Sequence, residues 1–220
     1  MADQQHDDPS PPAASTAPAA WRQRVAGGLF LVTGAGLVVH LLVGLPLWLT
    51  VMGGFVLAAV TFTLMGGGAL GSRLQRRVRV GLVSGMLATL AYDVTRLLLV
   101  STVGYSIKPF DTWRLFGLGL IGPNTSVAAQ WAAGVAFHVA NGLTFATAFT
   151  IWMGERGPVW GIGFALVLEG FMLSLYPGWL DIRSYSEFAQ VSVLGHLVYG
   201  SVLGASAQRL LGRSASKDAG

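Results

Sequence analysis

The sequence contains no cysteine and few charged residues. The absence of cysteine excludes disulfides, thiolate metal ligands and thiol redox chemistry. Charged residues make up only 11% of the 220 residues, whereas a soluble globular domain carries about 25%. A net charge of +4 could indicate nucleic acid as a partner, but the positions of the basic residues along the chain explain it as membrane topology instead.

Apolar and small residues dominate the composition. Hydrophobic residues make up 53% of the chain, which has 30 glycines and a mean hydropathy of +0.59. This composition predicts an all-α fold, a polytopic bundle of membrane helices. Small residues let spanning helices approach closely, so we expect helix contacts at Gly81-x-x-x-Gly85 and Gly200-x-x-x-Gly204.

The two ends of the chain differ from the middle. Residues 1–22 are rich in proline, alanine, serine and aspartate without an apolar period, and they predict a disordered cytoplasmic tail. The first apolar run is too long for a signal peptide and is expected to remain as a membrane anchor. We therefore predict a membrane domain over residues 23–212 and a second cytoplasmic tail over 213–220.

Six stretches are long and apolar enough to span a bilayer, which takes about 20 residues. The first apolar stretch is too long for one span, and Gly44-Leu45-Pro46 predicts a turn that divides it. The predicted spans are Val25–Gly44, Leu47–Ala69, Val78–Val100, Ser126–Trp152, Pro158–Tyr176 and Ala189–Leu211.

The basic residues predict the orientation of these spans, because lysine and arginine collect in cytoplasmic loops. One set of loops and both tails hold ten of them: Arg22, Arg24, Arg73, Arg76, Arg77, Arg79, Arg156, Arg209, Arg213 and Lys217. The opposite loops hold three: Lys108, Arg114 and Arg183. The sequence therefore predicts a protein of the cell (inner) membrane with both termini in the cytoplasm.

Two predicted outer loops are long and aromatic. The first contains Tyr105, Phe110, Trp113 and Phe116, with Asp111 placed to cap a short helix. The second, over residues 177–188, contains Trp179, Tyr185 and Glu187. Such segments favour the headgroup region and anchor a protein there. The alternative is that they form lids over a cavity that opens outwards.

Five ionisable residues lie inside the predicted spans, where each costs at least about 2.5 to 3.5 kcal/mol. They are Asp93, Arg96, His138, Glu169 and His196. Asp93, Glu169 and His196 are about 10 Å below the outer ends of their helices, Arg96 is shallower and His138 is deeper. Because polar groups at one level are most stable when they meet, we predict that all five converge on one outward-facing cavity.

Helical spacing adds three polar residues to this predicted site. Tyr92 shares a helix face with Arg96, Asn141 shares one with His138, and Tyr199 shares one with His196. We predict that Tyr92, Asn141 and Tyr199 donate hydrogen bonds to the five ionisable groups from positions that do not face the cavity. The competing interpretation is structural, because an intramembrane ion pair or histidine can simply join helices.

The chemistry of the predicted site leaves several functions open. The groups suit a proton relay, and proton-coupled, metal-ion or small-solute transport is the function that they favour. Alternatively, His138, Glu169 and His196 could hold a divalent metal, or the two histidines a haem, in a membrane enzyme. A third alternative is a noncatalytic membrane subunit. The expected partners are the lipid bilayer and either a second copy of the chain or another membrane protein.

Overall fold

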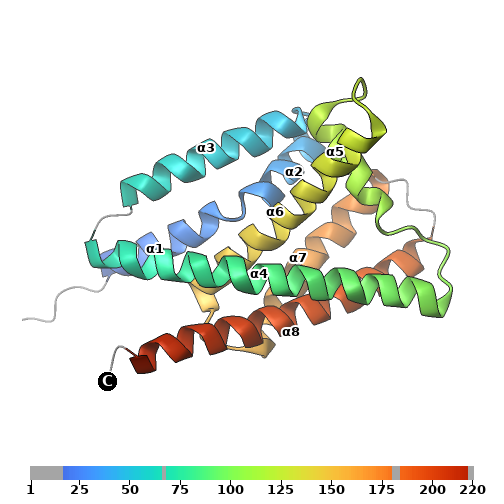
Figure 1. The fold of residues 1–220 in the computed structure, drawn as a ribbon. Coiled ribbons are helices and arrows are strands. Elements are labelled where there is room, and N and C mark those ends of the chain that lie inside the picture. The colour runs from blue at the N-terminus through green and yellow to red at the C-terminus, as the bar shows by residue number, and fades with distance from the viewer. Residues whose placement is uncertain (1–16, 66–67, 180–183, 218–220) are drawn as a thin grey trace, which may run out of the picture.

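The structure, a computed structural model, describes residues 17–65, 68–179 and 184–217. Within these ranges the chain folds into eight helices and contains no strand (Figure 1). The helices are α1 (Ala17–Leu29), α2 (Val32–Val43), α3 (Leu47–Met65), α4 (Gly68–Val103), α5 (Asp111–Ile121), α6 (Val127–Met153), α7 (Pro158–Trp179) and α8 (Tyr185–Lys217). The predicted all-α fold class is confirmed.

Five of these helices are long and apolar enough to cross a membrane, namely α3, α4, α6, α7 and α8. Each matches one of the predicted spans, and the apolar part of α4, Gly71–Val103, is longer than predicted. The predicted turn between the first two spans is also present. There Gly44 adopts a left-handed φ of 78° after α2, a conformation that glycine reaches without steric strain.

The predicted span Val25–Gly44 is not one straight helix. It is divided between α1 and α2, whose axes are bent by 62°. Two short-range hydrogen bonds end α1, from Phe30 N to Gly27 O at 3.1 Å and from Leu31 N to Gly28 O at 3.0 Å. Glycine lowers helix stability, so the pair of glycines weakens the helix where it breaks. The total is six spans only if this bent pair is counted as one.

Contacts with α6 determine the direction of α1. The side chain of Gln23 donates to Ile151 O at 2.6 Å, and Trp152 Nε1 donates to Arg24 O at 2.9 Å. These bonds join α1 to the end of α6. They therefore stabilise the bent arrangement through residues far away in the sequence.

Helix also extends into both predicted tails. α1 begins at Ala17, within the predicted tail over residues 1–22, and α8 continues to Lys217, within the predicted tail over 213–220. The remaining tail residues, 1–16 and 218–220, lie outside the described ranges.

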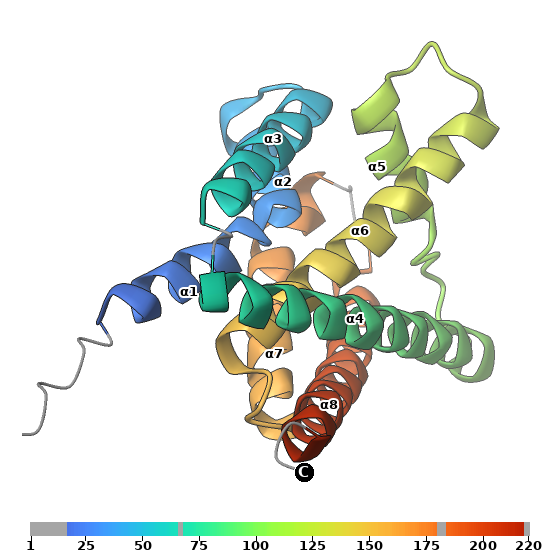
Figure 2. The same ribbon diagram turned by 60° about the vertical axis from the view of Figure 1, so that its left-hand side comes forward.

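α4 and α8 form the centre of the packing. α4 packs against α6 and α8, α7 packs against α8, and α2 and α3 form a hairpin at the edge of the bundle (Figure 2). The predicted small-residue contacts are present, since a Cβ atom added at Gly81 would lie 2.6 Å from Thr147 Cα and one at Gly200 would lie 2.5 Å from Gly161 O. Glycine therefore allows the backbones of α4 and α6, and of α7 and α8, to touch.

The short helix α5 lies against the start of α6. It begins at Asp111, but Phe110 is its N-cap residue and no side chain caps it. The prediction that Asp111 caps this helix was therefore wrong, although its charge in the first turn still suits the helix dipole. Through α5 the aromatic side chains of Trp113 and Phe116 reach α6, where Phe116 packs on Phe137.

Candidate functional site

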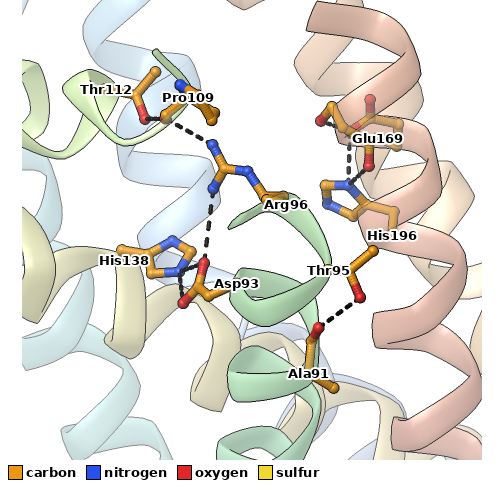
Figure 3. Close-up of polar contacts among 10 residues, drawn as sticks. Ala91, Asp93, Thr95, Arg96, Pro109, Thr112, His138, Glu169 and His196 are labelled. Atoms are coloured by element: carbon orange, nitrogen blue, oxygen red, sulfur yellow. Dashed lines mark hydrogen bonds and ion pairs between the residues drawn. The ribbon is translucent and has the colours of Figure 1, made fainter. Parts of the chain in front are cut away.

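Asp93 on α4 pairs with His138 on α6. The imidazole Nε2 of His138 donates to both carboxylate oxygens of Asp93 at 3.0 Å (Figure 3). Arg96, one turn further along α4, places Nη1 3.7 Å from the same carboxylate. Asp93 thus pairs with Arg96 within α4, and His138 joins this pair from another helix.

Arg96 also fixes the chain that follows α4. Its Nη2 donates to Pro109 O at 2.6 Å, and the guanidinium carbon lies 4.9 Å from the Tyr92 ring centre and 5.1 Å from that of Phe110. Only 5% of Arg96 is exposed. The charge is therefore compensated by a carboxylate, a carbonyl and two aromatic faces, as burial of a cation requires.

Glu169 on α7 pairs with His196 on α8. His196 Nδ1 lies 2.9 Å from Glu169 Oε2 and 2.9 Å from the carbonyl of Ser192, so its proton is shared between them. The hydroxyl of Ser192 donates to the same Oε2 at 2.9 Å. The second carboxylate oxygen, Oε1, is buried and has no hydrogen-bond partner among the described residues.

The two pairs lie on opposite sides of α4 (Figure 3). Tyr92 lies between their imidazoles, with ring centroids 4.9 Å from His196 and 6.1 Å from His138. The five predicted ionisable residues therefore do not meet at one point. They form two separate groups that a tyrosine ring connects.

A single cavity of about 280 Å³ reaches both imidazoles. Its lining comprises Leu31, Gly34, Ala35, Val38, Thr89, Tyr92, Phe116, His138, Asn141, Gly142, Phe145, Leu168, Phe171, Met172, Leu175, His196 and Tyr199. Most of these side chains are apolar. Of the five predicted ionisable residues, only His138 and His196 line the cavity. Asp93 and Glu169 each contact one of these imidazoles, and Arg96 contacts Asp93.

Tyr92, Asn141 and Tyr199 were not expected to face the cavity, but all three line it. Tyr199 donates its hydroxyl to Gly142 O at 2.7 Å, which joins α8 to α6. Asn141 Oδ1 is buried and has no hydrogen-bond partner within the described part of the chain. Tyr92 packs edge-on against His196 with an interplanar angle of 73°.

The aromatic segment between α4 and α5 is tied to the start of α8. Glu187 Oε2 accepts hydrogen bonds from the backbone and hydroxyl of Ser106 at 2.8 Å and from Ile107 N at 3.2 Å. Tyr105 donates its hydroxyl to Gln190 at 2.6 Å. Together with the bond from Arg96 to Pro109, these contacts hold this segment against the ends of α4 and α8. Part of the second aromatic segment, residues 180–183, lies outside the described ranges.

Comparison with protein families places most of the chain in one of them. Residues 75–218 match DUF6789, a family of unknown function. The chain belongs to DUF6789. No curated protein and no solved structure matches it.

The DUF6789 region covers most of α4 and all of α5 to α8. It therefore contains both carboxylate and imidazole pairs. The part of the cavity wall formed by α2, which includes Gly34, Ala35 and Val38, precedes this region. The N-terminal helices thus complete a cavity whose polar groups belong to the DUF6789 region.

The three predicted metal ligands are divided between the two pairs. His138 contacts Asp93, whereas Glu169 contacts His196. In the described ranges of the chain, no group of three or more His, Cys, Asp or Glu side chains is placed to hold a metal ion. The geometry of the DUF6789 region therefore gives the metal hypothesis no support.

Sequence reasoning missed two residues of this site and one contact. Ser192 lies one turn before His196, so helical spacing could have identified it. Thr89 lies one turn before Asp93, so helical spacing could have identified it as well. Trp113 was identified as part of an aromatic outer segment, but its contact with His138, with ring centroids 5.1 Å apart, could not be predicted, because the position of α5 on α6 is a tertiary contact.

Proposed function

We propose that this protein crosses the cell (inner) membrane six times, with both termini in the cytoplasm, and acts as a proton-coupled carrier of a small solute. In this proposal the solute binds in the cavity between α2, α4, α6, α7 and α8. The observation that carries the proposal is the presence of two imidazole and carboxylate pairs on one mostly apolar cavity inside the bundle.

The distribution of basic residues supports the orientation. Arg77 Nη2 pairs with Glu155 at 2.5 Å, and Arg76 donates to Leu211 O at 2.5 Å. These bonds bring the start of α4, the turn after α6 and the end of α8 to the same end of the bundle. Most of the basic residues assigned to the cytoplasm therefore share one end, as the preference of cytoplasmic loops for lysine and arginine requires.

The chemistry of the pairs supports proton coupling. A carboxylate and an imidazole in direct contact share one proton, and histidine can gain or lose a proton within the physiological pH range. Ionisable groups in this position mark ion and proton pathways in membrane proteins. Since both imidazoles face the cavity, a solute there would contact the groups that exchange protons.

Proton flux into vesicles tests this function. The purified protein is placed in liposomes that contain a trapped pH dye, and a potassium gradient with valinomycin drives proton entry. We expect entry several-fold faster than in protein-free liposomes, and we expect Glu169→Gln and Asp93→Asn to lower it about tenfold. Asp111→Asn is the control, because Asp111 is exposed on α5 and lies outside the cavity. If liposomes with and without protein take up protons at the same rate, or if Glu169→Gln does not lower the rate, the two pairs do not form a proton pathway through the protein.

A further inference from the structure

His138 and His196 each contact a carboxylate through one ring nitrogen. Asp93 accepts from Nε2 of His138, while Glu169 and the carbonyl of Ser192 both lie 2.9 Å from Nδ1 of His196 (Figure 3). These partners accept hydrogen bonds, so the nitrogen that contacts them carries a hydrogen. In a neutral imidazole only one nitrogen carries a hydrogen. The other nitrogen of each ring, Nδ1 of His138 and Nε2 of His196, therefore presents a lone pair when the ring is neutral.

These two ring nitrogens are accessible. Neither has a hydrogen-bond partner in the described part of the chain, and neither is among the buried polar atoms that lack one. The side chains of His138 and His196 are 15% and 10% exposed, and both histidines line the cavity. By contrast, the unpaired oxygens of Thr89 and Asn141 are themselves buried. The lone pairs of the imidazoles are therefore available to a ligand that donates a hydrogen bond.

The two pairs differ in charge balance. Asp93 also lies 3.7 Å from Arg96, so its negative charge is compensated when His138 is neutral. Glu169 contacts no arginine or lysine within the described ranges and relies on His196 alone. A proton on Nε2 of His196 therefore neutralises a buried negative charge, whereas a proton on Nδ1 of His138 adds a positive charge to a group that is already neutral. Charge compensation favours His196 as the residue that takes up the exchanged proton.

The other titratable groups around His196 keep their charge. They are Tyr92 on α4 and Tyr199 on α8, whose ring centroids lie 4.9 Å and 6.4 Å from that of the imidazole. Arg96, also on α4, contacts the Tyr92 ring. Tyrosine stays neutral and arginine stays protonated over the range in which histidine titrates. At this wall of the cavity, a change of pH therefore acts on the pair of Glu169 and His196.

The rest of the cavity determines the kind of molecule that fits. Most lining side chains are apolar, and the nearby charges have partners. A charged ligand would lose its hydration without finding an unpaired counter-ion, which is costly in an apolar site. An apolar cavity of about 150 Å³ accommodates benzene, and this cavity, at about 280 Å³, is nearly twice as large. It therefore matches an uncharged molecule with about two fused rings.

The cavity reaches the outer surface between α2 and α7. Ala35 on α2 and Phe171 on α7 both line it and are exposed, Phe171 by 62%. In the proposed topology this surface faces lipid tails. A molecule dissolved in the bilayer can therefore reach the cavity from the side.

We propose that the solute of the carrier is an uncharged lipophilic molecule that donates a hydrogen bond to Nε2 of His196, where it competes with the exchanged proton. The lone pair of Nε2 either binds the proton or accepts the hydrogen bond, but not both. When a proton from water binds Nε2, the solute loses its acceptor and dissociates; when the solute binds, that proton returns to water. The carrier thus exchanges the solute for protons. This inference rests on the proposed carrier function and names the class of its solute.

Binding to the full-length protein in lipid nanodiscs tests the inference. The probes are indole, whose N–H group is a hydrogen-bond donor only, and benzothiophene, which has nearly the same shape and no donor. Equilibrium dialysis against empty nanodiscs corrects for partition into lipid. Neither probe changes its charge between about pH 8 and about pH 5.5, where histidine titrates, so an effect of pH comes from the protein.

The expected result is a preference for indole that depends on pH. At about pH 8 the imidazole is neutral, and indole should bind about tenfold more tightly than benzothiophene, because one hydrogen bond contributes about 1.4 kcal/mol. At about pH 5.5 the proton occupies Nε2, and this preference should disappear. The affinity for benzothiophene should not follow the pH in this way, since it does not use the lone pair.

One substitution removes the acceptor and keeps the contact with Glu169. In His196→Asn the amide nitrogen lies nearly where Nδ1 lies and can still donate to Glu169 and Ser192, but nothing replaces Nε2. This variant should bind both probes alike at either pH, and retained binding of benzothiophene shows that it is folded. His40→Asn is the matched control, because His40 Nδ1 also contacts a carbonyl, that of Leu45 at 2.6 Å, and His40 lies outside the cavity. It should retain the preference for indole and its pH dependence.

Three results would overturn the inference: no preference of the wild type for indole at about pH 8, a preference that persists at about pH 5.5, or a preference that persists in His196→Asn. The assay uses no proton gradient, so it separates the two proposals. Proton flux without pH-dependent binding of indole would defeat the solute class and the exchange alone. Such binding without proton flux would defeat the carrier proposal and leave the site in place.

Discussion

Glu169 is the most deeply buried ionisable residue of the two pairs, with 2% of its surface exposed. One of its oxygens accepts from His196 and Ser192, and the other has no partner in the described ranges. Its stability inside the bundle therefore depends on His196, because a buried charge without a partner is strongly destabilising.

Replacement of one member of this pair should lower the free energy of unfolding more than replacement of both. We expect His196→Ala to lower the free energy of unfolding by about 3 to 5 kcal/mol, because Glu169 remains buried without its imidazole. The double variant Glu169→Leu with His196→Leu should lose less. Unfolding of the wild type and both variants in detergent micelles measures the difference. If the double variant loses as much free energy of unfolding as the single variant, or more, then His196 is not needed to stabilise the buried Glu169.

The ionisable residues could be identified from the sequence, but the pairing of each histidine with a carboxylate on another helix could not. Depth along each predicted span identified Asp93, Arg96, His138, Glu169 and His196. Which histidine faces which carboxylate depends on the rotation of each helix about its own axis. Packing against neighbouring helices sets this rotation, and the distances from the helix ends contain no information about it.

At the scale of helices, glycine contacts hold α7 and α8 together. A Cβ atom at Gly200 would lie 2.5 Å from Gly161 O, whereas one at Gly163 would meet no atom within 4 Å in the described structure. The two glycines therefore predict opposite responses to the same substitution.

We expect Gly200→Ala to destabilise the protein by about 1 to 3 kcal/mol, because the added methyl group forces the helices apart. Gly163→Ala is the matched control. It should be neutral or stabilising by up to about 1 kcal/mol, since alanine favours a helix where space allows. Melting temperatures of both variants in one detergent provide the comparison. Equal loss in both variants would argue against a close contact at Gly200.

The spans of α3, α4, α6, α7 and α8 could be predicted because each is a continuous apolar run of sufficient length. The division of the first span into α1 and α2 could not. No proline marks the break, and bonds to Ile151 and from Trp152 on the distant helix α6 stabilise the bend. The local sequence therefore predicts the length of an apolar span, but it does not predict a bend that tertiary contacts stabilise.

For the whole molecule, the proposed topology can be tested with single cysteines, because the chain contains no cysteine of its own. Asn124 lies between α5 and α6, and Ser72 lies near the start of α4; both are exposed. A maleimide that cannot cross membranes should label Asn124→Cys in intact cells and Ser72→Cys only after the cells are opened. Labelling of both variants in intact cells would contradict the orientation.

Two of the helices that line the cavity, α2 and α7, belong to different packing units. α7 is held mainly by α8, whereas α2 packs on α3 and α6, and α2 and α7 make few contacts with each other. The width of the cavity can therefore change without disruption of either unit. Bilayers differ in thickness, and a span adapts to this at a cost of fractions of a kcal/mol per Å. Occupancy of the cavity should consequently respond to membrane mechanics, so that the lipid composition acts as an effector alongside the ligand itself.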